Sequence, residues 1–255
     1  MRSFFTSLAA VVMLSFSLSR AQERTDGVVL FQTFFQDAPI AKNISGEGFL
    51  QYSDFENFSS IDLAVQSAFP VSRRVQIGGA LGFRSLSFNG GDESGITDLA
   101  ASMRYLAMQG PTAISVGGLI TLPIGSEDIG ESNFDFTGFG SLRHHFPSGL
   151  VLTSTLGLEF IEKSSFVYDP VLQQIVEEKD HDAQLLLAGG LIVPAGRALY
   201  FVGELDIRTE GDYVLLSGGL DYALKNGGRL RGALGLGLDD GAPNFALRGG
   251  YALGF

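Results

Sequence analysis

Along most of the chain, large apolar residues recur at every second position. From residue 44 onward the sequence divides into segments of about ten to twelve residues with this alternation. Segment 59–69, for example, sets Ile61 and Leu63 against Asp62 and Gln66. Because side chains alternate between the two faces of a β-strand, the pattern predicts strands with one apolar face. The predicted strands are 44–52, 59–69, 75–87, 96–107, 113–123, 134–145, 150–161, 182–193, 198–209, 213–224, 229–238 and 244–255.

The connections between these segments fall into two alternating classes. One class is tight and often basic, at 70–74, 108–112, 146–149, 194–197 and 225–228. The other is acidic and often longer, at 89–95, 125–132, 162–181, 209–212 and 239–243. With an even number of strands, both ends of the sheet and all the tight turns lie on one side. Short turns on the periplasmic side and longer loops outside are typical of bacterial membrane barrels.

Two all-β architectures fit strands with one apolar face. In a soluble sandwich or a lipocalin-like barrel, that face would form the core. Here, however, the opposite face is rich in Gly and Ala as well as charge, and regular hairpins without a crossover suit an up-and-down barrel better. A strand of about eleven residues tilted by about 40° spans about 28 Å, enough for the hydrocarbon core. We therefore predict a transmembrane up-and-down antiparallel β-barrel of about 12 strands over residues 44–255, in the bacterial outer membrane.

The N-terminal residues have the pattern of an export signal. Arg2 precedes an apolar stretch, and Ser19-Arg20-Ala21 fits a cleavage site, so we predict a cleaved signal peptide at 1–21, with an anchoring helix as the alternative. Residues 22–43 form a separate extension with an apolar patch at 28–35. This extension could lie at the periplasmic rim, fold into the lumen as a plug, or form an extra strand or a loosely ordered arm.

Composition excludes several other classes. No apolar run of 18 residues follows the N-terminus, which excludes a helical membrane protein. The formal net charge of −11 argues against nucleic acid as a partner, because binding it requires a basic surface. The absence of cysteine excludes a disulfide framework and a lipid-anchored N-terminus.

The inward faces of the predicted strands combine small residues with charges of both signs. Small residues such as Gly78 and Gly190 leave space, and opposed charges orient polar solutes. We expect the pore to be lined by Arg84, Asp98, Arg104, Glu159, Glu204, Asp206, Arg208 and Arg248. The simpler alternative is that these residues, with Asp62, Asp221 and Arg231, form a salt-bridge network that braces the barrel.

The final segment, "NFALRGGYALGF", alternates to its last residue. We expect Phe245, Leu247, Tyr251, Leu253 and Phe255 to face lipid, with Arg248 pointing inward. The aromatic ending resembles the signal that the outer-membrane barrel assembly machinery recognises, which we assign to Tyr251, Leu253 and Phe255.

Signals of catalysis are weak. The three histidines, His144, His145 and His181, have no partnering nucleophile motif, so we predict no enzyme, no catalytic residue and no cofactor. A weak divalent-cation site is conceivable at 177–182, but a solvated acidic loop is the simpler interpretation, and we predict no metal site. Acidic outer loops beside lipopolysaccharide are expected to bind bridging divalent cations.

Four stretches resemble one family. They are "SGITDLAASMRYLAM" (94–108), "GGLITLPIGSED" (117–128), "LYFVGELDIR" (199–208) and "DDGAPNFALRGGYALGF" (239–255). In this order they are similar to the transporter-like outer-membrane barrels described as "meta-pathway of phenol degradation", over about residues 90–255. The resemblance implies passage of hydrophobic or aromatic compounds across the outer membrane.

Two functions follow as hypotheses. The first is a channel or transporter that passes small solutes, including hydrophobic or aromatic ones, by passive diffusion through the outer membrane. The second is a structural or adhesive surface barrel whose acidic extracellular loops bind a partner.

Overall fold

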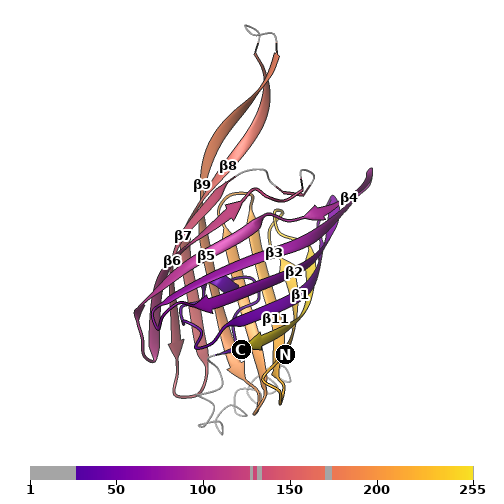
Figure 1. Ribbon diagram of the computed structural model, residues 1–255. Coiled ribbons are helices and arrows are strands. Elements are labelled where there is room, and N and C mark those ends of the chain that lie inside the picture. Colours follow the sequence, from indigo (N-terminus) through magenta and orange to yellow (C-terminus); the bar gives the residue numbers. More distant parts are fainter. Residues whose placement is uncertain (1–26, 127–128, 131–133, 170–173, 255) are drawn as a thin grey trace, which may run out of the picture.

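The computed structural model of the protein is a closed antiparallel β-barrel (Figure 1). It describes residues 27–126, 129–130, 134–169 and 174–254, so the predicted signal peptide lies outside the described residues. Successive strands pair antiparallel, β1 pairs with β13, and the β2–β3 pairing closes the ring. The strands are β1 (Ser45–Asp54), β2 (Phe58–Pro70), β3 (Val75–Phe88), β4 (Gly91–Ile96), β5 (Leu99–Met108), β6 (Thr112–Leu122), β7 (Asp135–His145), β8 (Val151–Asp169), β9 (Gln174–Pro194), β10 (Leu199–Arg208), β11 (Tyr213–Ala223), β12 (Arg229–Gly237) and β13 (Phe245–Gly254).

Strands β4 and β5 act as one interrupted strand. Residues Phe83–Phe88 of β3 pair with β4, and residues Val75–Ala80 of β3 pair with β5. The thirteen strands therefore form a barrel of twelve. The predicted continuous strand at 96–107 is therefore wrong at Thr97 and Asp98. The reason is a contact with a distant connection: the Asp98 carboxylate accepts a hydrogen bond from the amide of Gly125 at 2.8 Å, which holds the β6–β7 connection against the break. The predicted fold, a twelve-stranded up-and-down barrel, is confirmed.

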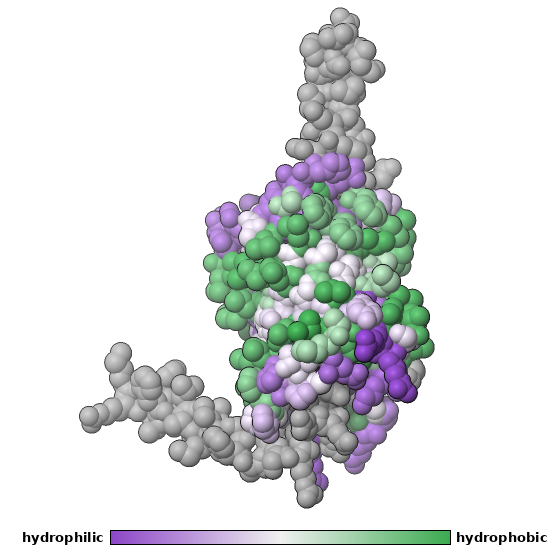
Figure 2. Space-filling model, turned by 90° about the vertical axis from the view of Figure 1, so that its left-hand side faces the viewer, coloured by the Kyte–Doolittle hydropathy of each residue, from purple (hydrophilic) through white to green (hydrophobic). Residues whose placement is uncertain are grey.

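The outer surface is apolar around the middle of the barrel. Figure 2 shows hydrophobic side chains over this band and hydrophilic ones toward both ends. Outward residues such as Leu63, Met103 and Leu247 are among the most exposed large apolar side chains of the molecule. In water so large an apolar surface would drive association, whereas hydrocarbon covers it at no cost. In the described part of the chain, no helix is long and apolar enough to cross a membrane.

The two ends of the barrel differ. At the terminal end, where β1 begins and β13 ends, the connections are the short segments 71–74, 109–111, 146–150, 195–198 and 224–228. The opposite end, called the hairpin end here, carries the connections 55–57, 89–90, 123–134, 209–212 and 238–244 and the β8–β9 hairpin. All five predicted tight turns thus gather at one end.

Two predicted acidic loops are wrong as loops. Most of 89–95 belongs to β4, and most of 162–181 belongs to β8 and β9, whose pairing continues to Asp169 and Gln174. This hairpin rises well above the barrel in Figure 1. Acidic residues indicate contact with water, but a two-stranded ribbon with both faces in water meets that condition as well as a loop does.

Residues 27–43, called the inner segment here, lie inside the barrel. The short 3₁₀ helix η3 (Phe34–Gln36) sits in this segment. Val28, Leu30 and Phe31 are buried against wall residues that include Ile192 and Tyr200. Of the placements that the sequence left open for the extension, these residues adopt the one within the lumen.

Candidate functional site: the barrel lumen

Glycines in the wall make room for the inner segment. A Cβ atom built on Gly78 would come within 2.7 Å of the Phe35 ring, and one on Gly190 within 2.6 Å of Leu30. Real side chains do not approach so closely, so a larger residue at either position would have to displace the segment, and also Ser102 at Gly78 or the carbonyl of Gly203 at Gly190. The space that small inward residues were expected to leave for a solute is occupied here by Phe35 and Leu30.

A single wall carboxylate binds the backbone of the inner segment. Glu204, in the middle of β10, accepts hydrogen bonds from the amides of Phe31 (2.8 Å), Gln32 (3.0 Å) and Thr33 (3.1 Å). The Thr33 hydroxyl donates a fourth at 2.9 Å. Hydrogen bonds to an ionised carboxylate are shorter and stronger than neutral ones. Glu204 thus anchors the backbone bend at 31–33.

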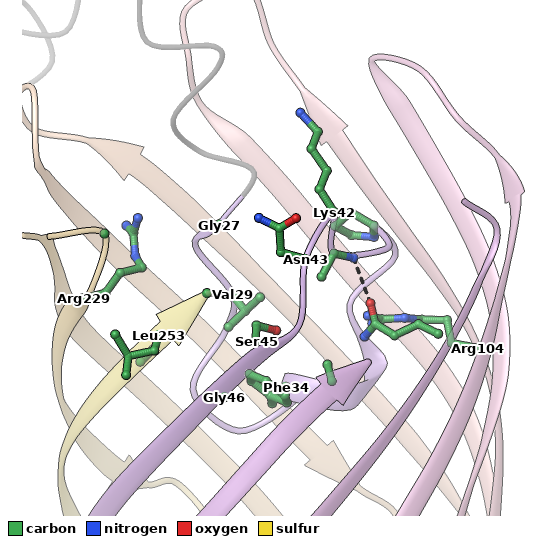
Figure 3. Close-up of a pocket in the computed structure, with 17 residues that line it drawn as sticks. Gly27, Val29, Phe34, Lys42, Asn43, Ser45, Gly46, Arg104, Arg229 and Leu253 are labelled. Atoms are coloured by element: carbon green, nitrogen blue, oxygen red, sulfur yellow. Dashed lines mark hydrogen bonds between the residues drawn. The ribbon is translucent and has the colours of Figure 1, made fainter. Parts of the chain in front are cut away.

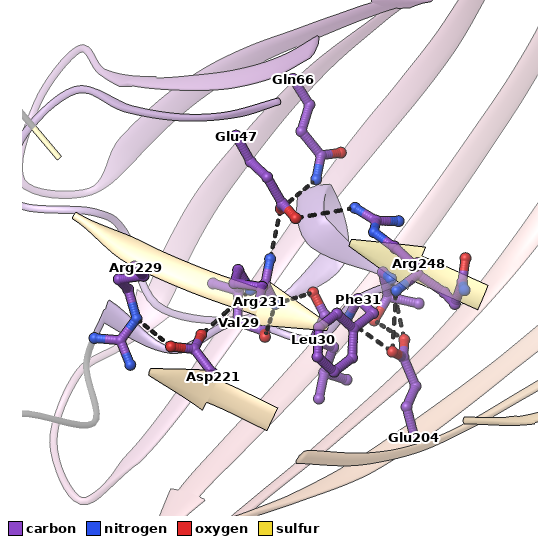
Figure 4. A network of polar contacts seen from close by, with 12 residues as sticks. Val29, Leu30, Phe31, Glu47, Gln66, Glu204, Asp221, Arg229, Arg231 and Arg248 are labelled. Atoms are coloured by element: carbon purple, nitrogen blue, oxygen red, sulfur yellow. Dashed lines mark hydrogen bonds and ion pairs between the residues drawn. The ribbon is translucent and has the colours of Figure 1, made fainter. Parts of the chain in front are cut away.

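Arg231 holds the same part of the segment from the opposite side (Figure 4). Its guanidinium donates to the carbonyls of Val29 (2.5 Å) and Leu30 (3.2 Å) and pairs with Glu47 at 2.5 Å. Glu47 also accepts from Gln66 (2.9 Å) and Arg248 (3.3 Å). Strands β1, β2, β12 and β13 thereby share one buried polar network with the inner segment.

The far part of the inner segment is bound just as closely. Arg104 donates to the carbonyls of Phe35 (3.3 Å) and Asp37, and Arg143 pairs with the Asp37 carboxylate. The carbonyl of Gln36 accepts from the hydroxyls of Thr155 (3.1 Å) and Ser141. These contacts satisfy most of the buried polar groups of a segment that has no strand partner.

The hairpin half of the lumen has a different character. Arg84 pairs with Asp62 at 2.5 Å, and its side chain is 44% exposed. Arg208 lies 3.8 Å from Glu159 with 40% of its side chain exposed, whereas Arg231 and Glu47 are at most 1% exposed. Solvent therefore reaches Arg84 and Arg208 in this half, whereas it does not reach the Arg231–Glu47 pair that holds the inner segment.

The expected pore-lining residues consequently divide into three groups. Arg104, Glu204 and Arg248 surround the inner segment or its supporting network, and Arg248 also stacks on Phe49 at 3.6 Å. Arg84, Glu159, Asp206 and Arg208 lie in the hairpin half, where Glu159 also accepts from Gln184 at 2.7 Å and Asp206 is buried. Asp98 stands apart at the break between β4 and β5.

The C-terminal strand follows its prediction in part. Phe245, Leu247 and Tyr251 are exposed on the outer face. Leu253, predicted to face lipid, is half-buried and is among the residues that line a cavity at the terminal end (Figure 3). Phe255 lies outside the described residues.

Sequence reasoning missed Glu47, Gln66, Asp37 and Arg143 as members of the lumen network. Glu47 could have been found, since β1 alternates and places it on the inward face. Asp37 carried a weaker signal, a lone charge after an apolar patch. Its partner Arg143 is 106 residues away and could not be read from the chain.

The described residues show little that could support other chemistry. They contain no group of three or more His, Cys, Asp or Glu side chains placed to hold a metal ion. The ring of His144 meets the Thr112 hydroxyl at 2.7 Å and packs edge-on against Phe146. Most of the acidic side chains at 177–182 lie outside what the structure describes.

Comparison with solved structures shows a shared fold. An outer-membrane channel from Pseudomonas putida F1 matches with a TM-score of 0.68 at 12% identity, over 89% of this chain and 100% of that chain. The KdgM porin in complex with disordered oligogalacturonate matches with a TM-score of 0.54 at 11% identity, over 83% and 99%. The β-domain of the Bordetella autotransporter BrkA matches with a TM-score of 0.55 at 14% identity, over 84% and 99%. The first two are named as a channel and a porin and not as enzymes.

No curated protein matches the chain. The closed barrel and its apolar outer band, together with the fold likeness to these outer-membrane proteins, place the chain in the bacterial outer membrane. The match to a family model covers residues 45–255, further toward the N-terminus than the four resembling stretches. The chain therefore belongs to the family described as "Putative MetA-pathway of phenol degradation".

Proposed function

We propose that this protein is an outer-membrane channel for passive diffusion of small solutes, and that the inner segment closes the terminal half of its lumen. The observation that carries the proposal is the contrast within the lumen. Arg84 and Arg208 of the hairpin half reach solvent, while the terminal half is occupied by a segment that has no strand partner. Such a segment can move out of the lumen without breaking the strand pairings that close the barrel. The similarity to a channel and a porin supports this function.

The proposed orientation of the barrel in the membrane rests on the difference between its two ends. In the proposed orientation the terminal end faces the periplasm and the hairpin end faces outward beside lipopolysaccharide. The short connections at the terminal end support it, as does the predicted signal peptide at 1–21. In this account the barrel assembly machinery recognises the ending that includes Tyr251, Leu253 and Phe255. Acidic residues of the hairpin end would bind divalent cations that bridge to lipopolysaccharide.

The solutes would include hydrophobic or aromatic compounds, as the family description suggests. Arg84, Glu159, Asp206 and Arg208 would line the entry, whereas Arg104, Glu204 and Arg248 would govern closure. The chain would move the solute without altering it chemically.

Solute flux tests the proposal. Purified protein in liposomes should admit small solutes, and weakening the hold on the inner segment should raise both the rate and the size limit. A barrel that stays impermeable in the native and the weakened form, in a strain that takes up solutes normally without it, would contradict the channel.

A second function is favoured by one feature, the long β8–β9 hairpin. Its ladder continues from Glu162 and His181 to Asp169 and Gln174, which sets a two-stranded ribbon with unpaired edges beyond the barrel. A surface-binding role predicts that replacing 162–181 by a short turn abolishes attachment to a partner and leaves permeability unchanged. If the same change alters only flux, this second function fails.

A further inference from the structure

The two ends of the barrel carry opposite charges on the connections between strands. At the hairpin end the charged residues of the connections are all acidic, Glu56 and Asp240 among them. At the terminal end they are all basic: Arg73, Arg74, Arg197 and Lys225. Figure 2 shows hydrophilic side chains beyond the apolar band at both ends. The barrel therefore presents a basic rim to one leaflet of the membrane and an acidic rim to the other.

Tyrosines on the outer face mark the boundary of the apolar band at the terminal end. Tyr105 and Tyr251 lie near the ends of β5 and β13, and both are exposed. Outward residues next to them, such as Met103 and Leu230, are exposed apolar side chains. A tyrosine ring suits hydrocarbon and its hydroxyl group suits water, so tyrosines gather where the hydrocarbon of a bilayer meets its headgroups. Lipid headgroups are therefore expected at the height of these two hydroxyl groups.

Arg74 stands at this height beside β5. One of its terminal nitrogens donates to the Tyr105 hydroxyl at 3.3 Å, and its carbonyl accepts the amide of Leu106 at 2.8 Å. The Ser72 hydroxyl accepts the amides of Arg74 (3.2 Å) and Val75 (3.0 Å), which fixes the turn. Arg74 is exposed, and the contact with Tyr105 uses one of its five N–H donors. Its other donors can bind phosphate oxygens, which match the guanidinium group in geometry and charge.

A similar arrangement stands at β12 and β13. The side-chain nitrogen of Asn226 lies 3.5 Å from the Tyr251 hydroxyl, and its side-chain oxygen accepts the amide of Gly228 at 3.1 Å. Gly227 between them has a φ of 86°, which favours glycine in this tight turn. Lys225, the residue before Asn226, is exposed, and a lysine stem can lie along an apolar surface while its ammonium group stays in water. Strands β1 and β2 separate this place from the one at Arg74, so each meets its own lipid.

We propose that the basic rim binds anionic phospholipids of the surrounding leaflet, with Arg74 and Lys225 each holding one phosphate-bearing headgroup. Apolar neighbours such as Met103 and Leu230 contact the acyl chains. Basic residues near a membrane surface attract net negative charge, and the acidic connections of the hairpin end repel it, so anionic lipids gather at one end only. Such binding does not require that the barrel conduct solutes.

Native mass spectrometry of the purified protein, released from a neutral detergent, measures how tightly lipids stay bound. Phosphatidylglycerol is the anionic probe, phosphatidylcholine the zwitterionic one, and glycerol phosphate the headgroup without acyl chains. Phosphatidylglycerol should bind about fivefold more tightly than phosphatidylcholine, the factor that one basic residue near the surface contributes. Equal binding of the two lipids would overturn the role of the cations, and equal binding of glycerol phosphate would overturn the assignment to lipid.

Charge-removing variants locate the sites. The double variant Arg74→Gln, Lys225→Gln should lose the preference for phosphatidylglycerol. The double variant Glu56→Gln, Asp240→Asn is the matched control, because it removes two exposed charges from connections at the opposite end, and it should keep the preference or increase it. A preference that survives the loss of both cations, or that falls equally in the control, would contradict the proposal.

Salt provides a test on the unaltered protein, which serves if the first double variant fails to fold. Exposed charges act over about 10 Å at about 0.1 M salt and over about 3 Å at about 1 M. Raising the concentration of ammonium acetate between these values should remove most of the preference for phosphatidylglycerol, because both cations are exposed. A preference that does not respond to salt would show that these charges do not cause it.

Discussion

The two halves of the lumen contain the same kinds of residues in opposite states. In the terminal half Arg231 and Glu47 form a pair that is fully buried, whereas in the hairpin half the arginines of the Arg84–Asp62 and Arg208–Glu159 pairs are partly exposed, at 44% and 40%. Removing charges from water is costly, and a buried pair is secure only while every member has a partner. Exposed pairs contribute little and rearrange easily. The difference supports the proposal that the first half anchors the inner segment, while the second half is the part of the lumen open to solvent.

The largest effect is expected from breaking the buried network. Glu47→Gln removes the charge that Arg231 and Arg248 share, and leaves two buried guanidinium groups with weaker acceptors. Loss of one partner of a buried pair typically costs about 3–5 kcal/mol. The free energy of unfolding, measured by urea titration of the barrel in detergent micelles, should fall by about this amount. A loss below about 1 kcal/mol would remove the distinction between the two halves.

The second prediction concerns the hold on the inner segment. Glu204→Gln keeps the shape of the side chain but turns an amide donor toward donors from Phe31, Gln32 and Thr33. Hydrogen bonds to charged groups are worth about 1.5–3 kcal/mol each, so the segment should leave its seat far more often. The chain has no cysteine, so Ala38→Cys, at a fully buried position, reports this opening by its maleimide labelling rate.

Maleimide labelling of the Ala38→Cys reporter should rise at least about tenfold when Glu204→Gln is added, the factor that about 1.4 kcal/mol corresponds to. Glu159→Gln, the same exchange in the hairpin half, is the control and should leave labelling unchanged. Equal rates in the two double variants would show that Glu204 does not hold the segment.

The third prediction uses the recess at Gly78. Gly78→Ala puts a methyl group where the Phe35 ring lies, and overpacking of this kind typically costs about 1–3 kcal/mol. Gly203→Ala is the matched control, because a Cβ there meets nothing within 4 Å. Thermal unfolding should separate the two variants, with Gly203→Ala close to wild type. If both behave alike, the recess is not shaped by the inner segment.

The smallest effect on stability is expected in the hairpin half. Asp62→Asn breaks the exposed pair with Arg84, and such pairs contribute about 0–1 kcal/mol. Unfolding should therefore hardly change, while the ratio of anion to cation conductance in planar bilayers should rise, because Arg84 loses its counter-charge. A large loss of stability with unchanged selectivity would show that this pair stabilises the barrel, as the buried pairs do, and does not influence ion passage.

The barrel and its faces could be predicted because alternation is a local property of the chain. The alternation of apolar and polar residues that places Leu63 and Asp62 on opposite faces of β2 is visible within three consecutive residues. The other predicted strands alternate in the same way. The break at Thr97 and Asp98 could not be predicted, since it depends on Gly125 in another connection. Charge misled the assignment of 162–181, because acidic residues indicate water without indicating a loop.

Some residues of the lumen network were predictable, but their partners were not. Arg104, Glu204 and Arg248 were identified as inward charges from the alternation. That Glu204 meets Thr33 171 residues earlier, and that Arg231 meets Glu47 184 residues earlier, depends on how the closed barrel brings distant strands around the segment. The apolar patch at 28–35 was visible, but its seat is formed by Gly78 and Gly190, far along the chain.

The most direct measurement of the central claim is a liposome swelling assay with solutes of graded size, run with the protein with and without residues 22–43. If the inner segment closes the terminal half, the intact protein admits only the smallest solutes slowly, and the shortened protein admits larger ones at much higher rates. Equal size limits and equal rates for two folded barrels would contradict the account.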